Sequence, residues 1–294
     1  MDGTSPERGC PRPDPAELHE LVGDVELALL AATAMEAEIL VQALEGAEPI
    51  EVATKRWWSG VLRHGDRAVT AAVIVTGYDK VNAAHALTCL LMTSCPALVV
   101  QVGAAGAYPP SGLAVGDVVL ATEEVYADTG VATPEGWLPA QAIGLPLAHA
   151  RDTDYWNAFP SDPGLVAAAA RVVEAVPWPG PPPRVLTGRC LTSSLVTGGT
   201  EAGERLARRW GALAESMEGA AAAHVCALYG VPFLEIRGIS NLVVDRDRAS
   251  WDLVGAAERA QRAALAVAAR LDEVLVATRG AAGPEEPLGG GWEA

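Results

Sequence analysis

The residues best suited to chemistry lie around one predicted helix–strand unit. Good helix formers run through residues 216–229, a Gly-Val-Pro break follows, and residues 233–239 have the apolar run of a buried strand. Glu218 falls near the start of this helix, and Ser240 and Asn241 follow the strand. Ligands of open α/β sheets bind at the carboxyl ends of the strands. We therefore expect these three polar side chains to meet in one small-molecule pocket.

The polar side chains of this unit differ in what they can bind. The two carboxylate oxygens of Glu218 suit a vicinal diol, although a glutamate here also stabilises a helix N-terminus. The amide of Asn241 can donate and accept hydrogen bonds, or it can cap the next turn. Arg237 lies in an otherwise apolar strand, where an unpaired charge is costly. It therefore needs a partner, such as Glu235 or a bound group.

A second acidic segment follows the first predicted strand. Residues 26–32, ELALLAA, predict a buried strand, and Thr33 with Glu36 has the T-x-x-E pattern of a capping box. A helix is expected from there to about Leu44. We interpret Glu36 as the capping partner of Thr33. Glu38 is a candidate for the carboxyl edge of the sheet, although a helix glutamate taken alone is usually a surface residue.

Helices and strands alternate along the chain, which predicts one α/β domain. The expected fold is three-layer α/β/α with a central mixed, mostly parallel β-sheet. We expect a disordered leader over 1–23, a single domain over 24–278 and a flexible tail over 279–294. The further strands are expected at 57–63, 69–76, 97–102, 116–126 and 185–191, and the further helices at 80–93, 164–176, 201–210 and 251–277. The Pro- and Gly-containing stretch 129–163 is expected to be an irregular excursion, and 103–106 a turn that closes its strand.

Composition excludes several classes of function. The formal net charge of −16 is unsuited to nucleic acid or an anionic membrane, which require clustered Lys and Arg. The five cysteines are scattered without a C-x-x-C pair, and the five histidines are dispersed, so neither a disulfide framework nor a zinc site is predicted. Neither a signal peptide nor a membrane-spanning run is evident. A soluble cytoplasmic protein is expected.

Four segments together resemble the nucleoside phosphorylase/nucleosidase family. They are AMEAE at 34–38, GAAGA at 103–107, SMEGAA at 216–221 and RGISN at 237–241, and they occur in that family's order. The first resembles the opening of the methylthioadenosine/S-adenosylhomocysteine nucleosidases. The longer run 215–253 looks most like the futalosine hydrolase branch. Two departures are Asp79, where the family usually has Gly, and Ala107, at the end of its G-x-A-G-G loop.

The resemblance implies cleavage of an N-glycosidic bond by water. It implies that Glu38 activates the water, that Arg237 lies beside both, and that Glu218 binds the ribose hydroxyls. Met217 would lie against the sugar, although a core methionine is an equally good interpretation. Further contacts are expected from Ser216 and Ser240, from the small residues Gly103, Ala104 and Gly106, which admit close approach, and from Leu195 and Val196, which would cover the base.

The resemblance also bears on the leaving base. The adenosine-cleaving nucleosidases have Asp where this chain has Asn241. An amide can donate to O6 or N7 and accept from N1–H, which suits a 6-oxopurine such as the hypoxanthine of futalosine, a precursor of menaquinone. An Arg at 246 or 248 could bind the benzoate of futalosine, although a solvated loop is the default interpretation.

Three other functions remain open at this point. They are a purine nucleoside phosphorylase, a methylthioadenosine nucleosidase and a non-catalytic nucleoside-binding protein. Residues 31–40 contain carboxylates and no Lys or Arg, which favours water over phosphate as the attacking group. No metal or organic cofactor is expected, and the family implies a homo-oligomer.

Overall fold

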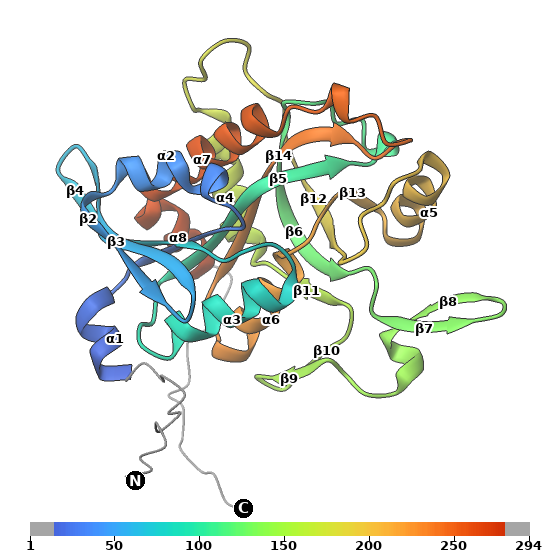
Figure 1. Cartoon of the computed structure of the whole chain (residues 1–294), viewed down its shortest axis with the longest axis horizontal. Helices are drawn as coiled ribbons and strands as arrows, with labels where there is room; N and C mark the ends of the chain where they lie inside the picture. Colours follow the sequence, from blue (N-terminus) through green and yellow to red (C-terminus); the bar gives the residue numbers. More distant parts are fainter. Residues whose placement is uncertain (1–14, 280–294) are drawn as a thin grey trace, which may run out of the picture.

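A computed structural model describes residues 15–279, which form a sheet covered by helices on both faces (Figure 1). The expected three-layer α/β/α architecture is confirmed. The predicted leader differs in part, because residues 15–22 form helix α1 (Pro15–Val22) and His19 hydrogen-bonds Thr93. The rest of the leader, 1–14, lies outside the described residues. So does the tail, apart from Arg279 at the end of the last helix.

The main sheet has ten strands, nine of which follow one path. In spatial order these are β11 (Ala158–Pro160), β6 (Val118–Tyr126), β12 (Val185–Thr192), β13 (Ala212–Ser216), β5 (Leu98–Ala107), β1 (Leu27–Ala31), β4 (Arg67–Val75), β3 (Lys55–His64) and β2 (Glu45–Val52). The central pairs β4–β1, β1–β5 and β6–β12–β13 are parallel, and the outer pairs β2–β3, β3–β4 and β11–β6 are antiparallel. The tenth strand, β14 (Phe233–Leu242), pairs in parallel with β5 and in antiparallel with β6. The pairings of β5, β13, β12, β6 and β14 therefore close a ring.

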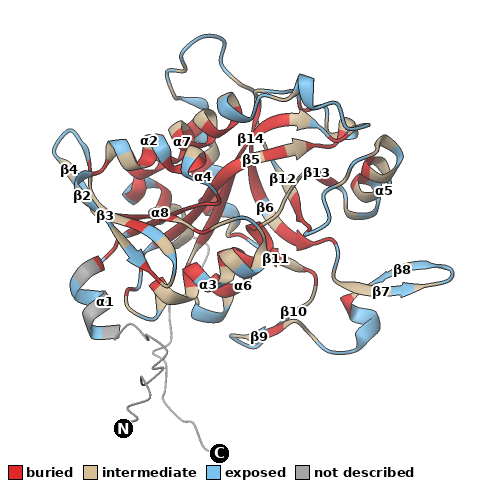
Figure 2. Cartoon of the chain, viewed as in Figure 1, coloured by how far each residue is buried: buried red, intermediate tan, exposed pale blue. Residues whose placement is uncertain are grey.

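Two apolar clusters hold the helices on the sheet. One face carries α2 (Ala34–Ala43), α4 (Pro163–Glu174), α7 (Leu253–Ala269) and α8 (Leu271–Arg279). The other face carries α3 (Lys80–Leu91) and α6 (Gly219–Tyr229). Helix α5 (Thr200–Trp210) packs on β13. The central strands β1, β5 and β14 are buried from both sides (Figure 2), as the apolar runs predicted, whereas the edge strands β2 and β3 are largely exposed or half-buried. Within the described chain, none of the helices has the length and hydropathy needed to cross a membrane.

Several predicted boundaries were wrong in ways that matter for the site. Strand β5 does not turn at Gly103 but runs on to Ala107, and β14 extends through Asn241. The helix expected from residue 216 begins instead at Gly219 with Glu218 as its N-cap, and residues 212–216 form the strand β13, which was not predicted. Small residues allow these extensions, because they fit a crowded sheet where strands pair on both sides. The predicted final helix is two helices, α7 and α8.

The excursion after β6 is more regular than expected. It contains the hairpin β7 (Gly130–Thr133) and β8 (Gly136–Pro139), the 3₁₀ turn η2 (Ala140–Ile143), and the hairpin β9 (Ala148–Ala150) and β10 (Thr153–Tyr155). Its last residues return to the sheet as β11. Two further 3₁₀ turns, η1 (Pro109–Ser111) and η3 (Arg248–Ser250), lie in loops beyond β5 and β14.

Candidate active site

A cavity of ≈ 260 Å³ lies at the carboxyl ends of β1, β5, β12, β13 and β14. This is the edge at which the sequence placed the pocket. Its lining comes from segments that are distant in sequence: Ala32, Thr33, Glu36, Tyr78, Ala104, Ala105, Gly106, Ser193, Leu195, Val196, Thr197, Glu215, Ser216, Met217, Glu218, Arg237, Ser240, Asn241, Arg246, Trp251 and Leu253. The folded sheet therefore assembles one site from seven segments of the chain.

Arg237 lies at the floor of the cavity, surrounded by acceptors. Its Nε donates to Oε1 of Glu235 at 2.6 Å, its Nη2 donates to Oε2 of Glu218 at 3.1 Å, and its Nη1 donates to the carbonyl of Ala104 at 3.3 Å. The guanidinium is 1% exposed. Burial opposes its charge, but the carboxylates of Glu235, Glu218 and Glu36 outweigh that effect and raise the pKa of Arg237 above its usual value. Arg237 is therefore a fixed cation, and the ion pair with Glu235 expected from the sequence is present.

Glu36 reaches the same floor from the first turn of α2. Its Oε1 accepts from the backbone N–H of Ala104 at 2.9 Å, and its Oε2 accepts from the hydroxyl of Thr33 at 2.8 Å. The capping box predicted for Thr33 and Glu36 is confirmed. A capping box turns the third helical side chain back toward the strand end. The contact that caps the helix thus also delivers a buried carboxylate to the cavity.

Glu38 does not join the other predicted site residues. It is exposed, it does not line this cavity, and its carboxylate accepts from Gln42 one turn later. Two residues along an α-helix rotate a side chain by about 200°, so Glu38 points away from the floor when Glu36 points toward it. The interpretation of Glu36 as a capping partner alone was incomplete, and Glu36 takes the place in the cavity that was expected for Glu38.

Gly103 lies under the cavity where these groups converge. A Cβ on it would lie 2.5 Å from Nη1 of Arg237 and 2.7 Å from Oε1 of Glu36. The bare backbone is what lets the two side chains approach each other across β5. At Gly106 a Cβ would lie 2.9 Å from Val243 and 3.2 Å from the amide of Asn241. The close contacts at Gly103 and Gly106 are with side chains of this chain, and the expected approach of the sugar or water to this backbone stays a prediction.

Glu218 is held on both sides at the start of α6. Oε1 accepts from the backbone N–H of Asp79 at 3.1 Å, and Oε2 pairs with Arg237. Asp79 takes the left-handed φ of 76° that glycine adopts more easily, and its carboxylate accepts from Lys80 N–H and the Ser194 hydroxyl. Those two hydrogen bonds stabilise Asp79 in the left-handed conformation at a position where the family usually has Gly. In this conformation the backbone N–H of Asp79 donates to Glu218.

Three further predicted residues lie around Glu218. Met217 lines the cavity and is half-buried. Ser216 also lines it, and its buried Oγ has no hydrogen-bond partner in the described chain. Ser240 donates to Oδ1 of Asn241 at 2.8 Å, which orients the amide with its Nδ2 donor away from Ser240. Asn241 is partly exposed and available to a bound molecule.

An exposed loop covers the cavity after β12. Leu195 and Val196 line the cavity and are 79% and 45% exposed, so residues 15–279 leave this apolar surface uncovered. Glu215 anchors the loop, because it accepts from the N–H and hydroxyl of Thr197 at 3.1 and 2.6 Å. The Tyr108 hydroxyl donates to Glu215 at 2.7 Å. Sequence reasoning missed Glu215, since it predicted no strand between the helices at 201–210 and 216–229.

The mouth of the cavity has one cation that forms no ion pair among the described residues. Arg246 lines the mouth, and its guanidinium stacks on Trp251 with 4.9 Å to the ring centroid. Arg248 stacks on the same ring at 5.8 Å but does not line the cavity. An aromatic ring with a free guanidinium is suited to a planar, anionic group.

Comparisons with known proteins show the family to which this chain belongs. Residues 26–276 match the Phosphorylase superfamily. The futalosine hydrolase of Thermus thermophilus is 40% identical over 194 residues, which cover 65% of this chain and 79% of that protein. The futalosine hydrolase of Acidothermus cellulolyticus is 32% identical and covers 83% and 91% of the two chains. The 5′-methylthioadenosine/S-adenosylhomocysteine nucleosidase of Staphylococcus carnosus is 30% identical, with 74% and 88% covered.

Solved structures share the fold at lower identity. The 5′-methylthioadenosine/S-adenosylhomocysteine nucleosidase of Neisseria meningitidis, in complex with methylthio-immucillin-A, superposes with a TM-score of 0.69 and 24% identity. The match covers 83% of this chain and 98% of that one.

Proposed function

This chain belongs to the phosphorylase superfamily, and from that membership we propose that it is an N-glycosyl hydrolase that cleaves futalosine to hypoxanthine and dehypoxanthine futalosine. The observation that carries the proposal is the convergence of Glu36, Arg237 and Glu218 beneath a cavity bordered by Asn241. Futalosine hydrolases among the relatives support this substrate.

Glu36 is proposed as the base that activates water. Its carboxylate is buried at the floor, and Arg237 lies across Gly103 from it. A water between the two would donate one proton to Glu36 while its oxygen attacks the anomeric carbon. The bond from that carbon to the purine nitrogen breaks, and the leaving base takes up the bonding electrons and a proton from solvent. Arg237 would hold the water and stay protonated throughout.

Glu218 is proposed to bind the ribose through its 2′- and 3′-hydroxyls. The ion pair with Arg237 and the hydrogen bond from Asp79 fix the direction of its oxygens, so the carboxylate needs little reorganisation. Met217 and the unpartnered hydroxyl of Ser216 border the same space. This set suits the sugar better than the base, because it is deep and acceptor-rich.

Asn241 is proposed to bind the departing 6-oxopurine. Ser240 donates to Oδ1, and Nδ2 donates one of its two protons to the carbonyl of Leu242 at 3.1 Å. The second Nδ2 proton would stabilise charge that develops on O6 or N7. The apolar side chains of Leu195 and Val196 would cover the ring. An amide stabilises the anionic base by hydrogen bonding and not by proton transfer.

Arg246 is the feature that favours futalosine over a neutral 5′-substituent. A carboxylate on an aromatic ring matches a guanidinium stacked on Trp251 at the mouth of the cavity. Methylthioadenosine cleavage is the second candidate, supported by relatives such as the Staphylococcus carnosus enzyme. Phosphorolysis is disfavoured, because the buried carboxylate of Glu36 at the floor would repel phosphate, and Arg237 is already paired.

The decisive experiment incubates the protein with futalosine, methylthioadenosine and inosine, with and without phosphate, and measures release of free base. We expect phosphate-independent release of hypoxanthine from futalosine at the highest kcat/KM. If release requires phosphate, the reaction is phosphorolysis and not hydrolysis. If methylthioadenosine is preferred, it and not futalosine is the substrate. Absence of release from all three would indicate a binding protein.

The proposal includes a homo-oligomer in the cytoplasm, active in menaquinone biosynthesis. Exposed apolar side chains on α3 and α6, and just beyond α3, support self-association: Val81 at 79%, Met92 at 61%, Leu228 at 53% and Tyr229 at 41%. A second copy would cover this face. Light scattering on the purified protein should give more than one subunit, and Leu228→Glu should lower that number.

A further inference from the structure

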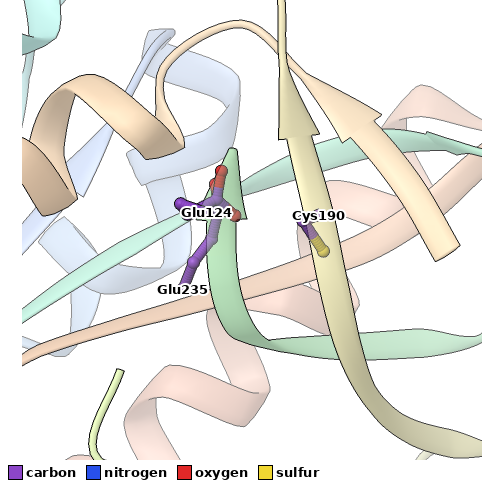
Figure 3. A group of neighbouring side chains, drawn as sticks. All are labelled: Glu124, Cys190 and Glu235. Carbon is purple, nitrogen blue, oxygen red and sulfur yellow. The ribbon is translucent and has the colours of Figure 1, made fainter. Parts of the chain in front are cut away.

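A buried pair of carboxyl groups lies directly behind Arg237. Figure 3 shows Glu124, from β6, and Glu235, from β14, converging, with Cys190 on the neighbouring strand β12. One carboxylate oxygen of each glutamate and the sulfur of Cys190 lie within 4.8 Å of one another. Both glutamates are 0% exposed. Neither was singled out for this pairing by the sequence, since the two lie on different strands.

Each of the two carboxyl groups has one oxygen satisfied and one without a partner. Oε1 of Glu235 accepts from Arg237, and Oε2 of Glu124 accepts from the Thr192 hydroxyl at 2.9 Å. The Thr192 oxygen accepts in turn from the N–H of Ala220 at 2.7 Å, so its single proton is committed to Glu124. Oε1 of Glu124 and Oε2 of Glu235 have no hydrogen-bond partner in the described chain. Two carboxyl groups with oxygens within 4.8 Å of each other thus each hold an unpartnered buried acceptor, and a donor between them is lacking.

The charges around the pair point to what supplies that donor. Arg237 is the cation in contact with Glu235, and it is shared with Glu218 and Glu36, which are also buried. A fourth buried carboxylate charge would have no cation to balance it, and two carboxylates this close do not both ionise readily. Burial raises the pKa of Glu235 even though Arg237 opposes the shift. The pair is expected to keep one proton at neutral pH.

We propose that Glu124 carries this proton and uses it to donate a hydrogen bond to the carboxylate of Glu235. The two then form a hydrogen-bonded acid pair that fixes Arg237 beneath the cavity. The ionised Glu235 then faces Arg237, and the neutral Glu124 bridges Glu235 to Thr192. Both are positioning residues, because they act on the water and Glu36 only through Arg237. The inference rests on the proposed hydrolase for its kinetic consequence, but not for the proton itself.

A metal ion at the three side chains is the competing occupant, and the structure favours the proton. Burial raises the pKa of the Cys190 thiol to about 12, with Arg237 opposing, and a thiol must lose its proton to bind a metal. The Cα of Gly219 also packs against both carboxyl groups, since a Cβ there would overlap Oε2 of Glu235 and Glu124.

The other titratable groups near the pair come from four elements. They are Arg237 on β14, Cys190 on β12, Glu218 at the start of α6 and Glu36 on α2. His224, further along α6, has its pKa lowered by burial and stays neutral. Among these neighbouring groups, the acid pair is therefore the one expected to lose a proton at an alkaline pH below the pKa of Cys190.

The test compares Glu124→Gln with Glu124→Ala and Glu235→Gln. A Gln amide can still donate to Glu235 and accept from Thr192, so Glu124→Gln should keep kcat within about threefold. Glu124→Ala removes both bonds, and Glu235→Gln removes the charge facing Arg237, so each should lower kcat about tenfold or more. We expect kcat of the wild type to fall at alkaline pH as the pair loses its proton, and this fall should shift or disappear in Glu124→Gln. Equal losses in Glu124→Gln and Glu235→Gln would overturn the proposal.

Infrared spectroscopy tests the proton without any substrate. At pH 8 the wild type should show the carbonyl stretch of a protonated carboxyl, shifted by D₂O, and Glu124→Gln should lack it. Absence of that band in the wild type would overturn the inference, whatever the enzyme cleaves. Metal analysis is the other arm, because a stoichiometric metal in the wild type that is lost in Glu124→Gln would assign the site to that ion. If Glu124→Gln does not fold, the wild-type band and metal content still decide.

Discussion

Arg237 and Glu218 form an ion pair, with 3.1 Å from Nη2 to Oε2, and both side chains are almost completely buried. Breaking a buried pair by removing one partner leaves the other charge uncompensated. Glu218, proposed to bind the sugar, and Arg237, proposed to hold the water, are therefore held in position by each other. A change in either is expected to affect both substrate binding and the rate of the chemical step.

The identity of the base is tested by Glu36→Gln. Positioned general bases contribute about 100-fold or more, so kcat for the preferred nucleoside should fall by at least ~100-fold. Glu38→Gln, on the exposed side of the same helix, is the matched control and should stay within about twofold. A larger loss in Glu38→Gln than in Glu36→Gln would return the role to the residue first predicted.

The space at Gly103 is tested by Gly103→Ala. The new Cβ would overlap the far ends of the Glu36 and Arg237 side chains and no backbone atom, so these side chains must shift while the fold should survive. A displacement of about 1 Å can cost ~100-fold in rate, and we expect a loss of that order in kcat. Gly198→Ala is the control, because nothing lies within 4 Å of its Cβ position. Circular dichroism of both variants should match the wild type, and full activity of Gly103→Ala would refute the convergence.

The choice of base is tested by Asn241→Asp. A carboxylate accepts where the amide donates, and a buried polar group left unpaired costs about 1–3 kcal/mol. The ratio of kcat/KM for futalosine to that for methylthioadenosine should fall at least ~10-fold. Ser240 still donates to the new carboxylate, so the fold should be kept. An unchanged ratio would mean that the purine edge is read elsewhere.

Recognition of the benzoate carboxylate of futalosine is tested by Arg246→Ala. Losing one exposed charge pair of ~1 kcal/mol should raise KM for futalosine about fivefold and leave KM for inosine unchanged, because inosine has no such group. Arg248→Ala is the matched control, since it stacks on Trp251 outside the cavity. Equal effects of Arg246→Ala on both substrates would exclude the contact.

Stability against acid is tested by Asp117→Asn. The Asp117 carboxylate accepts from Ala114 N–H at 2.8 Å and from Arg184, and although burial opposes the shift, these contacts lower its pKa. A lowered pKa contributes stability that is present above the unfolded value and lost as pH falls through the folded one. Asp117→Asn should cost about 1–3 kcal/mol of unfolding free energy at pH 7. Urea titrations should show this cost shrinking toward pH 3, and a constant cost would mean that the charge is not responsible.

The sequence predicted the layers, most strands and the segments that meet at the site, because apolar runs and caps are local signals. It failed where tertiary pairing overrides local preference. Gly103 to Ala107 has turn composition but extends β5, since β13 and β14 pair with it on either side. The direction of Glu36 was implied by its capping box with Thr33, but motif matching selected Glu38 two residues later. Glu124, Glu215 and Tyr108 could not be found, because their partners come from other strands.

The double pairing of β14 has a consequence for motion. Along Ile236–Gly238 this strand pairs with β5 on one side and with β6 on the other, so it has no free edge at which local unfolding could begin. The floor of the cavity can open only together with the interior of the protein, and its amides should be among the slowest to exchange with deuterium. The motion that admits and releases a nucleoside is then expected in the loop at 193–197. Substitutions in that loop can change which substrate is preferred without destabilising the central sheet.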